Sequence, residues 1–440
     1  MNDNQENLTA VGYRWRSAKW FILSTIAIAL FAETFLYGFL VPILGYMIQN
    51  RLHIDPSQTQ KLTSTILGLH GALAVLSGPI IGHFADGSRN KKGALLWSLG
   101  FCIIGTGIVA GARSVPLLLI GRAMQGIAGS AVWIVGFATV GETVSPDNMG
   151  SAMGLMMSFA NSGTVSGPAL SGLLLEATSY WITWSIPVIV LTIDLLARVI
   201  MIEPPSACKK NGDVAETTNL LSSGQHERNP SDVGAFWRIM LCDGRVLTCL
   251  LITMTSTIVT TSLDATLPLH VQEKFGWGPS CAGLLFSGLV IPGLIVGPIA
   301  GWVRDRVGAR VPIVLGSILQ SALLGLMGIA GSDAVPWASV RTGGKSMYIA
   351  SIIGIGAVRP FVSGLAPVEL TAAAKSRQEK SPGIFGLQGG ISRVFSMLDV
   401  AASLGSMIGP ILGGSLRALV GYEYMSWAWS TSLDTFYSHY

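Results

Sequence analysis

The chain has 440 residues, of which 50% are hydrophobic and only 12% are charged, and its mean hydropathy is +0.55. Soluble domains carry about 25% charged residues, so this composition excludes an ordinary soluble protein and predicts a membrane protein with several spans. The formal net charge of +4 says little about function, because basic residues are needed on cytoplasmic loops in any case. No basic patch of the kind that binds nucleic acid is recognisable in the sequence. The cysteines are scattered and lack C-x-x-C spacing, so neither a metal site nor a disulfide framework is expected.

Residues 1–19 are polar and basic, and we interpret them as a cytoplasmic tail. The apolar run that follows is too long for the h-region of a cleavable signal peptide. It is better interpreted as the first span, which doubles as a signal anchor.

Eleven stretches are long enough to cross a bilayer, since a spanning helix needs about 20 mostly apolar residues. The predicted spans are Trp20–Ile43, Thr63–Phe84, Ala94–Gly111, Val115–Gly141, Met149–Leu175, Trp181–Ile202, Val246–Val271, Ala282–Val303, Val311–Gly331, Met347–Val368 and Ile391–Leu416. Residues 203–245 are polar and are interpreted as a flexible cytoplasmic linker. The linker separates an N-terminal six-helix half, residues 20–202, from a C-terminal half, residues 246–440.

The C-terminal half has five clear spans and then an aromatic stub after Gly421. The stub contains Glu423 and Asp434 and is too short and too polar to be a clear span. We therefore expect the twelfth helix to be truncated, or replaced by a segment at the membrane interface, where Trp and Tyr are enriched.

A nine-residue pattern occurs twice, as Gly78–Asp86 and as Gly297–Asp305, each time at the end of an apolar stretch and before a basic loop. Two copies this far apart predict two homologous halves, and duplicated halves in a hydrophobic chain are typical of secondary transporters. Lys and Arg are concentrated in the N-terminus, the linker and both repeat loops, which places these segments on the cytoplasmic side.

Three motifs carry the functional information. The loop after the second span fits G-x-x-x-D-R-x-G-R-R/K with glycine in place of the first arginine, and its second copy follows the eighth span. Their matching residues are Gly82, Asp86, Arg89, Lys91, Lys92, Gly301, Asp305, Arg306 and Arg310. The fourth span contains Arg122 and Gln125 in a pattern that fits R-x-x-Q-G-x-G, except that Ala128 precedes the second glycine, Gly129. The fifth span has a glycine-proline motif of Gly154, Gly163, Gly167, Pro168 and Gly172.

With these motifs, the chain resembles the major facilitator superfamily over nearly its whole length. More narrowly, it is similar to the twelve-span drug:proton antiporters and the vesicular amine transporter-like group. The resemblance implies an all-α bundle of two six-helix halves, with a substrate cavity near the bilayer midplane and alternating access by rocking.

The resemblance also implies a role for each motif. The loop motif would latch a cytoplasmic gate, the alternative being a basic flank that only sets orientation. Arg122 would serve proton coupling, the alternative being a structural or snorkelling arginine. The fifth-span motif marks exporters rather than uptake symporters, although its glycines also serve ordinary tight packing.

Isolated charges within spans are candidates for binding a proton or a cation, because an unpaired charge is costly in the membrane. Glu33, Asp264 and Asp399 are the main candidates, and Asp194 and Arg359 are weaker ones. The alternative is an ion pair buried for structure. A lone histidine such as His70 is more often a packed, hydrogen-bonded residue, and Glu142 and Glu369 fit either a gate or an interfacial cap.

We therefore expect a proton-coupled secondary transporter that exports a small organic molecule, such as a drug, toxin, secondary metabolite or amine. The alternatives are an uptake symporter or facilitator, and a transport-deficient paralogue or sensor. No nucleotide-binding loop, catalytic triad or cofactor site is recognisable, so enzymatic chemistry is not expected. The expected partners are substrate, protons and lipid, and the expected state is a monomer. The plasma membrane is favoured, and an acidic dileucine pattern at Glu216, Leu220 and Leu221 keeps the vacuole or a vesicle as the alternative.

Overall fold

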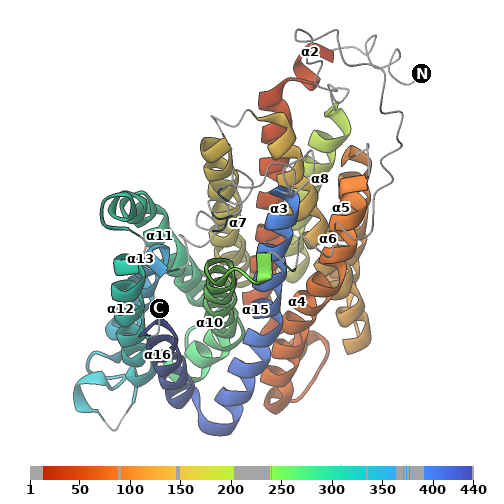
Figure 1. The fold of residues 1–440 in the computed structure, drawn as a ribbon. Helices are drawn as coiled ribbons and strands as arrows, with labels where there is room; N and C mark the ends of the chain where they lie inside the picture. The colour runs from red at the N-terminus through yellow and green to blue at the C-terminus, as the bar shows by residue number, and fades with distance from the viewer. Residues whose placement is uncertain are drawn as a thin grey trace, which may run out of the picture.

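The computed structural model describes residues 13–87, 91–144, 149–202, 238, 240–308, 310–332, 335–362, 370, 373, 376 and 391–438. Every regular element in these ranges is a helix (Figure 1). The helices are α2 (Tyr13–Arg16), α3 (Lys19–Tyr46), η1 (Met47–Arg51), α4 (Pro56–Gly87), α5 (Lys91–Gly111), α6 (Val115–Thr143), α7 (Met149–Ala177), α8 (Tyr180–Ile200), α10 (Gly244–Phe275), α11 (Pro279–Val307), α12 (Arg310–Ile329), η3 (Pro336–Ala338), α13 (Gly344–Val362), α15 (Ile391–Val420) and α16 (Tyr422–Ser438). The predicted all-α membrane fold is confirmed.

Each of the eleven predicted spans overlaps one long helix, and most helices extend a few residues beyond the apolar run, while residues 363–368 of the tenth span lie outside the described residues. In the part of the chain that the structure describes, nine helices are long and apolar enough to cross a membrane. Helices α7 and α13 are not among the nine, yet α7 packs along α3 and α13 packs along α11 within the same bundle.

The aromatic stub forms helix α16, which packs along α12 (Figure 1). Its residues Tyr422, Met425 and Trp429 are buried, and the Trp429 indole donates a hydrogen bond of 3.0 Å to the Ser262 hydroxyl of α10. At 1.5 Å per residue, α16 is about 25 Å long, somewhat shorter than a bilayer core of about 30 Å. The stub is thus a short helix built into the bundle, and these aromatic side chains face protein.

The two halves meet along two pairs of helices, α4 with α15 and α7 with α11, while α3 packs on α7 and α10 packs on α15 within the halves. Small residues allow the close approach. A side-chain carbon at Gly163 or Gly167 of α7 would overlap the backbone of α3, and one at Gly405 of α15 would lie 2.6 Å from the Met254 carbonyl oxygen of α10. Such packing of small residues is the usual means by which membrane helices associate.

We call the end of the bundle where α3 and α10 begin the basic end, and the other end the opposite end. At the opposite end, Gln60 of α4 donates a hydrogen bond of 3.1 Å to the Ala265 carbonyl of α10. Arg417 of α15 binds Glu273 at 2.6 Å and also donates to Gln60. The halves are therefore joined by polar contacts at the opposite end.

Helix ends at this side follow local capping rules. The hydroxyl and the backbone N–H of Ser57 lower the pKa of the exposed Asp55, the residue just before α4. Helix α10 ends at Phe275 and is capped by Gly276, whose φ of +67° is the left-handed conformation that favours glycine. These two helix boundaries therefore carry residues suited to capping.

Candidate functional site

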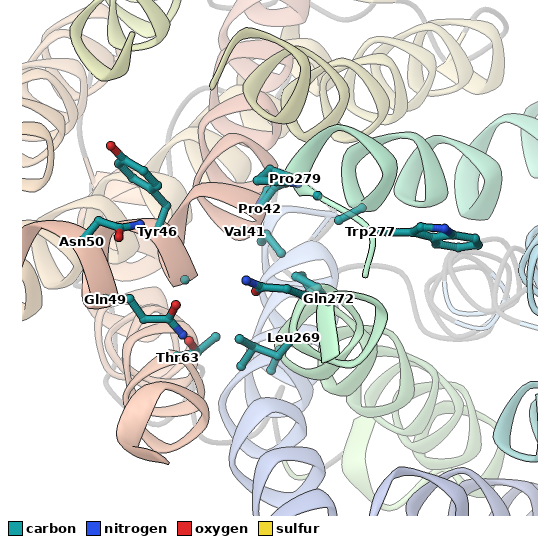
Figure 2. A pocket seen from close by; sticks show the side chains of 15 residues that line it. Val41, Pro42, Tyr46, Gln49, Asn50, Thr63, Leu269, Gln272, Trp277 and Pro279 are labelled. Carbon is teal, nitrogen blue, oxygen red and sulfur yellow. The ribbon is translucent and has the colours of Figure 1, made fainter. Parts of the chain in front are cut away.

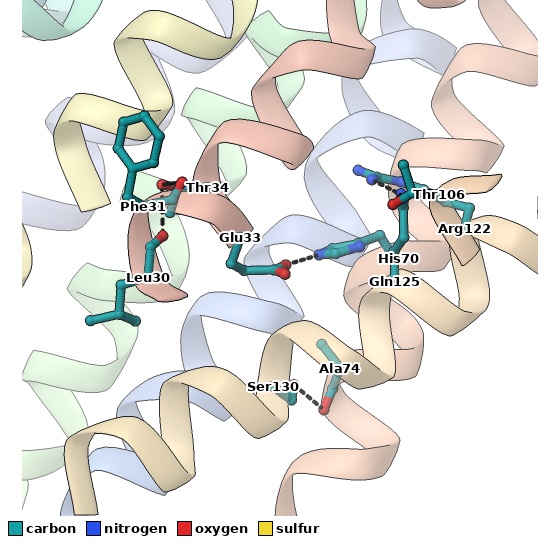
Figure 3. Close-up of polar contacts among 10 residues, drawn as sticks. All are labelled: Leu30, Phe31, Glu33, Thr34, His70, Ala74, Thr106, Arg122, Gln125 and Ser130. Carbon is teal, nitrogen blue, oxygen red and sulfur yellow. Dashed lines mark hydrogen bonds and ion pairs between the residues drawn. The ribbon is translucent and has the colours of Figure 1, made fainter. Parts of the chain in front are cut away.

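Glu33 lies in the middle of α3 and is only 7% exposed. Its Oε1 atom is 3.9 Å from Nε2 of His70 on α4, as Figure 3 shows. On its other side lies Gly129 of α6, where a side-chain carbon would overlap the Glu33 carboxylate. Glu33 therefore sits where α3, α4 and α6 meet, and the second glycine of the fourth-span motif makes room for it.

Arg122 of α6 is 1% exposed and interacts electrostatically with this carboxylate, from which the His70 side chain separates it in Figure 3. Its Nη1 donates to Oε1 of Gln125 at 3.0 Å, and the Gln125 amide donates to the Thr106 hydroxyl of α5 at 2.9 Å (Figure 3). Its Nε and Nη2 have no hydrogen-bond partner within the described residues. A buried cation with spare donors is costly unless an anion or a cavity compensates it, so Arg122 holds a positive field over Glu33.

Tyr37 connects Arg122 to the C-terminal half. The guanidinium carbon of Arg122 lies 5.0 Å from the centre of the Tyr37 ring, a cation–π contact, and the His70 ring lies 5.2 Å away. The Tyr37 hydroxyl interacts with the carboxylate of Asp264 on α10, without the geometry of a full hydrogen bond. Asp264 in turn interacts electrostatically with Arg359 of α13. Tyr37 thus interacts with charged groups of both halves, Arg122 of the N-terminal half and Asp264 of the C-terminal half.

Asp399 of α15 faces the N-terminal half. Its Oδ2 lies near Gly78 of α4, where an added side-chain carbon would be 3.6 Å away, and the carboxylate interacts with Ser130 of α6. Ser130 also donates to the Ala74 carbonyl at 3.3 Å (Figure 3). Oδ2 has no hydrogen-bond partner among the described residues, so Asp399 is a second buried carboxylate at the contact between halves.

Asp194 has a different environment. It forms a bidentate ion pair with Arg198 one turn later on α8, with oxygen–nitrogen distances of 2.8 and 2.6 Å. Arg198 also donates to the Leu95 carbonyl of α5 at 2.5 Å, and both charged residues are 1% exposed. This is the structural ion pair that the sequence left open as the alternative for Asp194.

The glycine-proline motif lies at the contacts of α7. Gly163 and Gly167 face α3, and Pro168 fits against Gly38, where a side-chain carbon would lie 2.8 Å from the proline ring. A side-chain carbon at Gly172 would overlap the Pro279 carbonyl of α11. The motif therefore serves both the α3 contact and the contact between halves, while the surroundings of Gly154 lie outside the described residues.

The loop motifs are described only in part. Gly82 faces α15, where a side-chain carbon added at Gly82 would lie 3.5 Å from the Ser396 hydroxyl oxygen. Lys92 donates to the carbonyls of Val199 and Met201 at 2.8 and 2.5 Å, so it caps the C-terminus of α8 within its own half. Lys91 begins α5, the Arg306 guanidinium lies 4.3 Å from the Trp302 ring, and Arg310 is exposed. Outside the described residues or side chains lie Asp86, Arg89, Glu142, Glu216, Leu220, Leu221, Gly301, Asp305 and Glu369.

Sequence reasoning selected Glu33, Arg122 and Gln125 but missed Tyr37, and it gave Gly129 no role beyond its place in the fourth-span motif. Tyr37 lies one turn after Glu33 on α3, a helical spacing that places both on the same face, and this spacing was a usable signal. No group of three or more metal-ligating side chains occurs among the described residues. The arrangement holds buried charges and offers places for a proton or a cation.

Comparisons with known proteins identify the family. The model of the Major Facilitator Superfamily matches residues 26–397. An uncharacterized MFS-type transporter, C18.02 of Schizosaccharomyces pombe, is 29% identical over 90% of this chain and 89% of its own. The MFS-type transporter ppzB of Metarhizium rileyi is 26% identical over 94% of this chain and 92% of its own. The multidrug resistance protein MdtG of Proteus mirabilis is 22% identical over 88% of this chain and 87% of its own.

The fold agrees with these matches. The crystal structure of the human organic anion transporter MFSD10 is similar with a TM-score of 0.65 and 15% identity, covering 96% of this chain and 99% of the other. The chain belongs to the major facilitator superfamily, as its motifs indicated, and it is a membrane transporter of the MFS type rather than an enzyme.

Proposed function

We propose that this transporter exchanges protons for a small organic molecule and exports that molecule by alternating access. The observation that carries the proposal is the position of Glu33, buried between three helices, beside His70 and in the positive field of Arg122. A carboxylate in such a place is costly to keep charged without a partner. Binding a proton or a cationic substrate relieves the same cost, so the two compete for it.

Asp399 serves as the second exchangeable carboxylate in this scheme, and Arg122 tunes the proton affinity of Glu33. Asp264 stays with Arg359 and contributes to the polar cavity instead. The orientation of Asp399 toward α4 and α6 supports a link between its protonation and the contact between the halves.

Export as the direction rests on the glycine-proline motif of α7 and on a relative that is named a multidrug resistance protein. The distribution of Lys and Arg supports a cytoplasmic N-terminus and linker, with the basic end facing the cytoplasm. We place the monomeric protein in the plasma membrane, with a vacuolar or vesicular membrane as the alternative. The loop motifs act as the cytoplasmic latch, although Lys92 serves the end of α8.

The test uses purified protein in liposomes, with ethidium as a fluorescent amphipathic cation and a pH gradient of either sign. Exchange predicts that ethidium accumulates in vesicles with an acidic interior and that the interior becomes more alkaline as it does so. Accumulation driven by an acidic exterior would instead identify an uptake symporter. Ethidium movement that is independent of the pH gradient would identify a facilitator. Either result would overturn the proposal.

A further inference from the structure

A second site lies at the opposite end of the bundle, away from the buried charges. It is a cavity of about 170 Å³ between α3, η1 and α4 of one half and α10 and α11 of the other. Its wall begins at Val41 of α3, eight residues after Glu33 and about 12 Å further along the helix axis. The cavity is therefore separate from the proposed coupling site.

The fifteen lining residues include no Asp, Glu, Lys, Arg or His. Polar groups come from uncharged side chains, chiefly Gln49, Thr63 and Gln272. Figure 2 shows Gln49 and Gln272 on facing walls of the cavity, one from each half, and the Gln49 amide donates a hydrogen bond of 3.1 Å to the Thr59 hydroxyl of its own half. Apolar surface comes from residues such as Pro42 and Leu269. A few convergent polar groups on apolar walls are the usual composition of a small-molecule site.

The hydroxyl of Thr63 adds an independent observation. Thr63 is 4% exposed and lines the cavity, yet its Oγ1 has no hydrogen-bond partner among the described residues. Buried hydroxyls are normally satisfied, so Thr63 leaves an unused hydrogen-bonding group in the wall of the cavity. The adjoining segment η1 is a π-helix, an irregularity that occurs often at functional sites.

Three charged residues near the cavity, Arg51, Glu176 and Glu273, have partners outside it. The guanidinium of Arg51 on η1 lies 4.0 Å from the centre of the Tyr180 ring. Glu176 accepts hydrogen bonds of 3.0 and 2.5 Å from the backbone and hydroxyl of Ser280, and Glu273 pairs with Arg417. An ion inside the cavity would lose hydration and meet no charged side chain among the lining residues, which is unfavourable.

We propose that this cavity binds a small uncharged molecule, about one ring in size, with a carbonyl or amide that hydrogen-bonds Gln272 and Thr63. The volume is close to that of a cavity of about 150 Å³ that accommodates benzene. Because such a ligand touches both halves, its binding favours the conformation in which the opposite end is closed. The inference does not depend on proton coupling and concerns a site that the transport proposal leaves unused.

The test measures binding to the full-length protein in detergent at pH 7, without any gradient, by saturation-transfer NMR. Three probes share one shape and differ in charge: neutral benzamide, anionic benzoate and cationic benzamidine. Benzamide is expected to bind at least tenfold more tightly than either ion at the cavity. The double variant Gln272→Leu with Thr63→Val is expected to weaken benzamide at least tenfold. Gln320→Leu removes a buried amide on α12, outside the cavity, and is expected to change binding less than twofold.

A third variant, Gly45→Leu, fills the cavity without disturbing the backbone, because a side-chain carbon at Gly45 meets only Leu269 at 3.8 Å. It is expected to abolish benzamide binding while the melting temperature stays unchanged, which separates loss of the site from loss of the fold. Benzamide binding that survives both cavity variants would overturn the proposal, as would its absence in the unmodified protein. Benzamidine binding of equal strength that the cavity variants remove would also contradict an uncharged site. A failure here leaves gradient-driven transport intact, so it is distinguishable from a failure of the proposed function.

Discussion

The carboxylate of Glu33 occupies space that a glycine on the facing helix leaves open. Gly129 belongs to α6, the helix that also carries Arg122, so one helix provides both the space and the positive field for the same acid. The distance between Glu33 and His70 is 3.9 Å, longer than a hydrogen bond, and a proton on either group would strengthen their interaction. A small displacement of the carboxylate would therefore alter both contacts.

The substitution Gly129→Ala tests this arrangement. The added methyl group would overlap the Glu33 carboxylate and push it away from α6, so gradient-driven ethidium transport should fall at least tenfold. Gly141→Ala on the same helix is the matched control, because a side-chain carbon there meets no atom within 4 Å. Equal transport by the two variants, measured in liposomes at equal protein content, would show that the position of Glu33 does not matter.

The ion pair of Asp194 and Arg198 should matter for stability. Removing Asp194 alone leaves a buried guanidinium without its carboxylate, a loss of about 3–5 kcal/mol for buried pairs of this kind. Asp194→Ala should therefore lower the melting temperature in detergent substantially. The double variant Asp194→Leu with Arg198→Leu should recover much of the loss, since no charge is left unpaired. A single variant as stable as the unmodified protein would refute the structural role.

Sequence alone indicated which residues are unusual but not which of them meet. Glu33 and Arg122 stood out because charges are rare within spans, Gln125 stood out as part of the fourth-span motif, and the structure brings these residues into one region. Asp194 stood out for the same reason, although Arg198 lies four residues later, a spacing that predicts a helical ion pair. The role of Gly129 depends on a contact between α3 and α6, and no pattern within one helix reveals such a contact.

At the scale of elements, periodicity and length located the helices well. The predicted and observed spans differ mainly at their ends, because helices continue past the apolar core into capping residues such as Asp243 before α10. The prediction was least complete for α16, because its polar residues make the segment too hydrophilic to be recognised as a span. Its stability comes from packing on α12 and α15, and tertiary packing of this kind cannot be derived from hydropathy.

A tryptophan pair on α16 tests whether this helix contributes to the bundle. Trp429 is 8% exposed and donates to Ser262, whereas Trp427 is 46% exposed. Trp429→Ala should cost about 3 kcal/mol, the lower range for a buried aromatic residue, and lower the melting temperature. Trp427→Ala has the same change in volume and should have little effect. Similar melting temperatures for both variants would mean that α16 adds nothing to the stability of the bundle.

At the scale of the whole molecule, alternating access requires the contacts at the opposite end to break and reform. Arg417 joins α15 to Gln60 of the N-terminal half and to Glu273. Contacts of this partly exposed kind contribute about 0.2–1 kcal/mol, so each one biases the equilibrium between conformations without fixing it. The transporter can then change conformation at modest cost.

Arg417→Ala should therefore open the opposite end more often. Ser64 is 5% exposed and faces Gly414 between the halves, so Ser64→Cys reports opening through its rate of labelling by an impermeant maleimide. In a Cys281→Ser background, Arg417→Ala should raise this rate about two- to fivefold, as expected for a loss of 0.5–1 kcal/mol. Arg341→Ala removes an exposed arginine from the loop before α13 and should leave the rate unchanged. An equal labelling rate with and without Arg417→Ala would show that this contact does not hold the opposite end closed.

Proton-coupled exchange requires that substrate and proton compete for Glu33. The most direct measurement is the release of protons when ethidium is added to the detergent-purified protein in a weakly buffered solution near neutral pH. We predict that the unmodified protein releases protons in proportion to bound ethidium, and that Glu33→Gln binds ethidium with much less release. Asp399→Asn, measured alongside, should reduce the release only in part. Proton release by Glu33→Gln that equals that of the unmodified protein, at equal binding, would contradict the account.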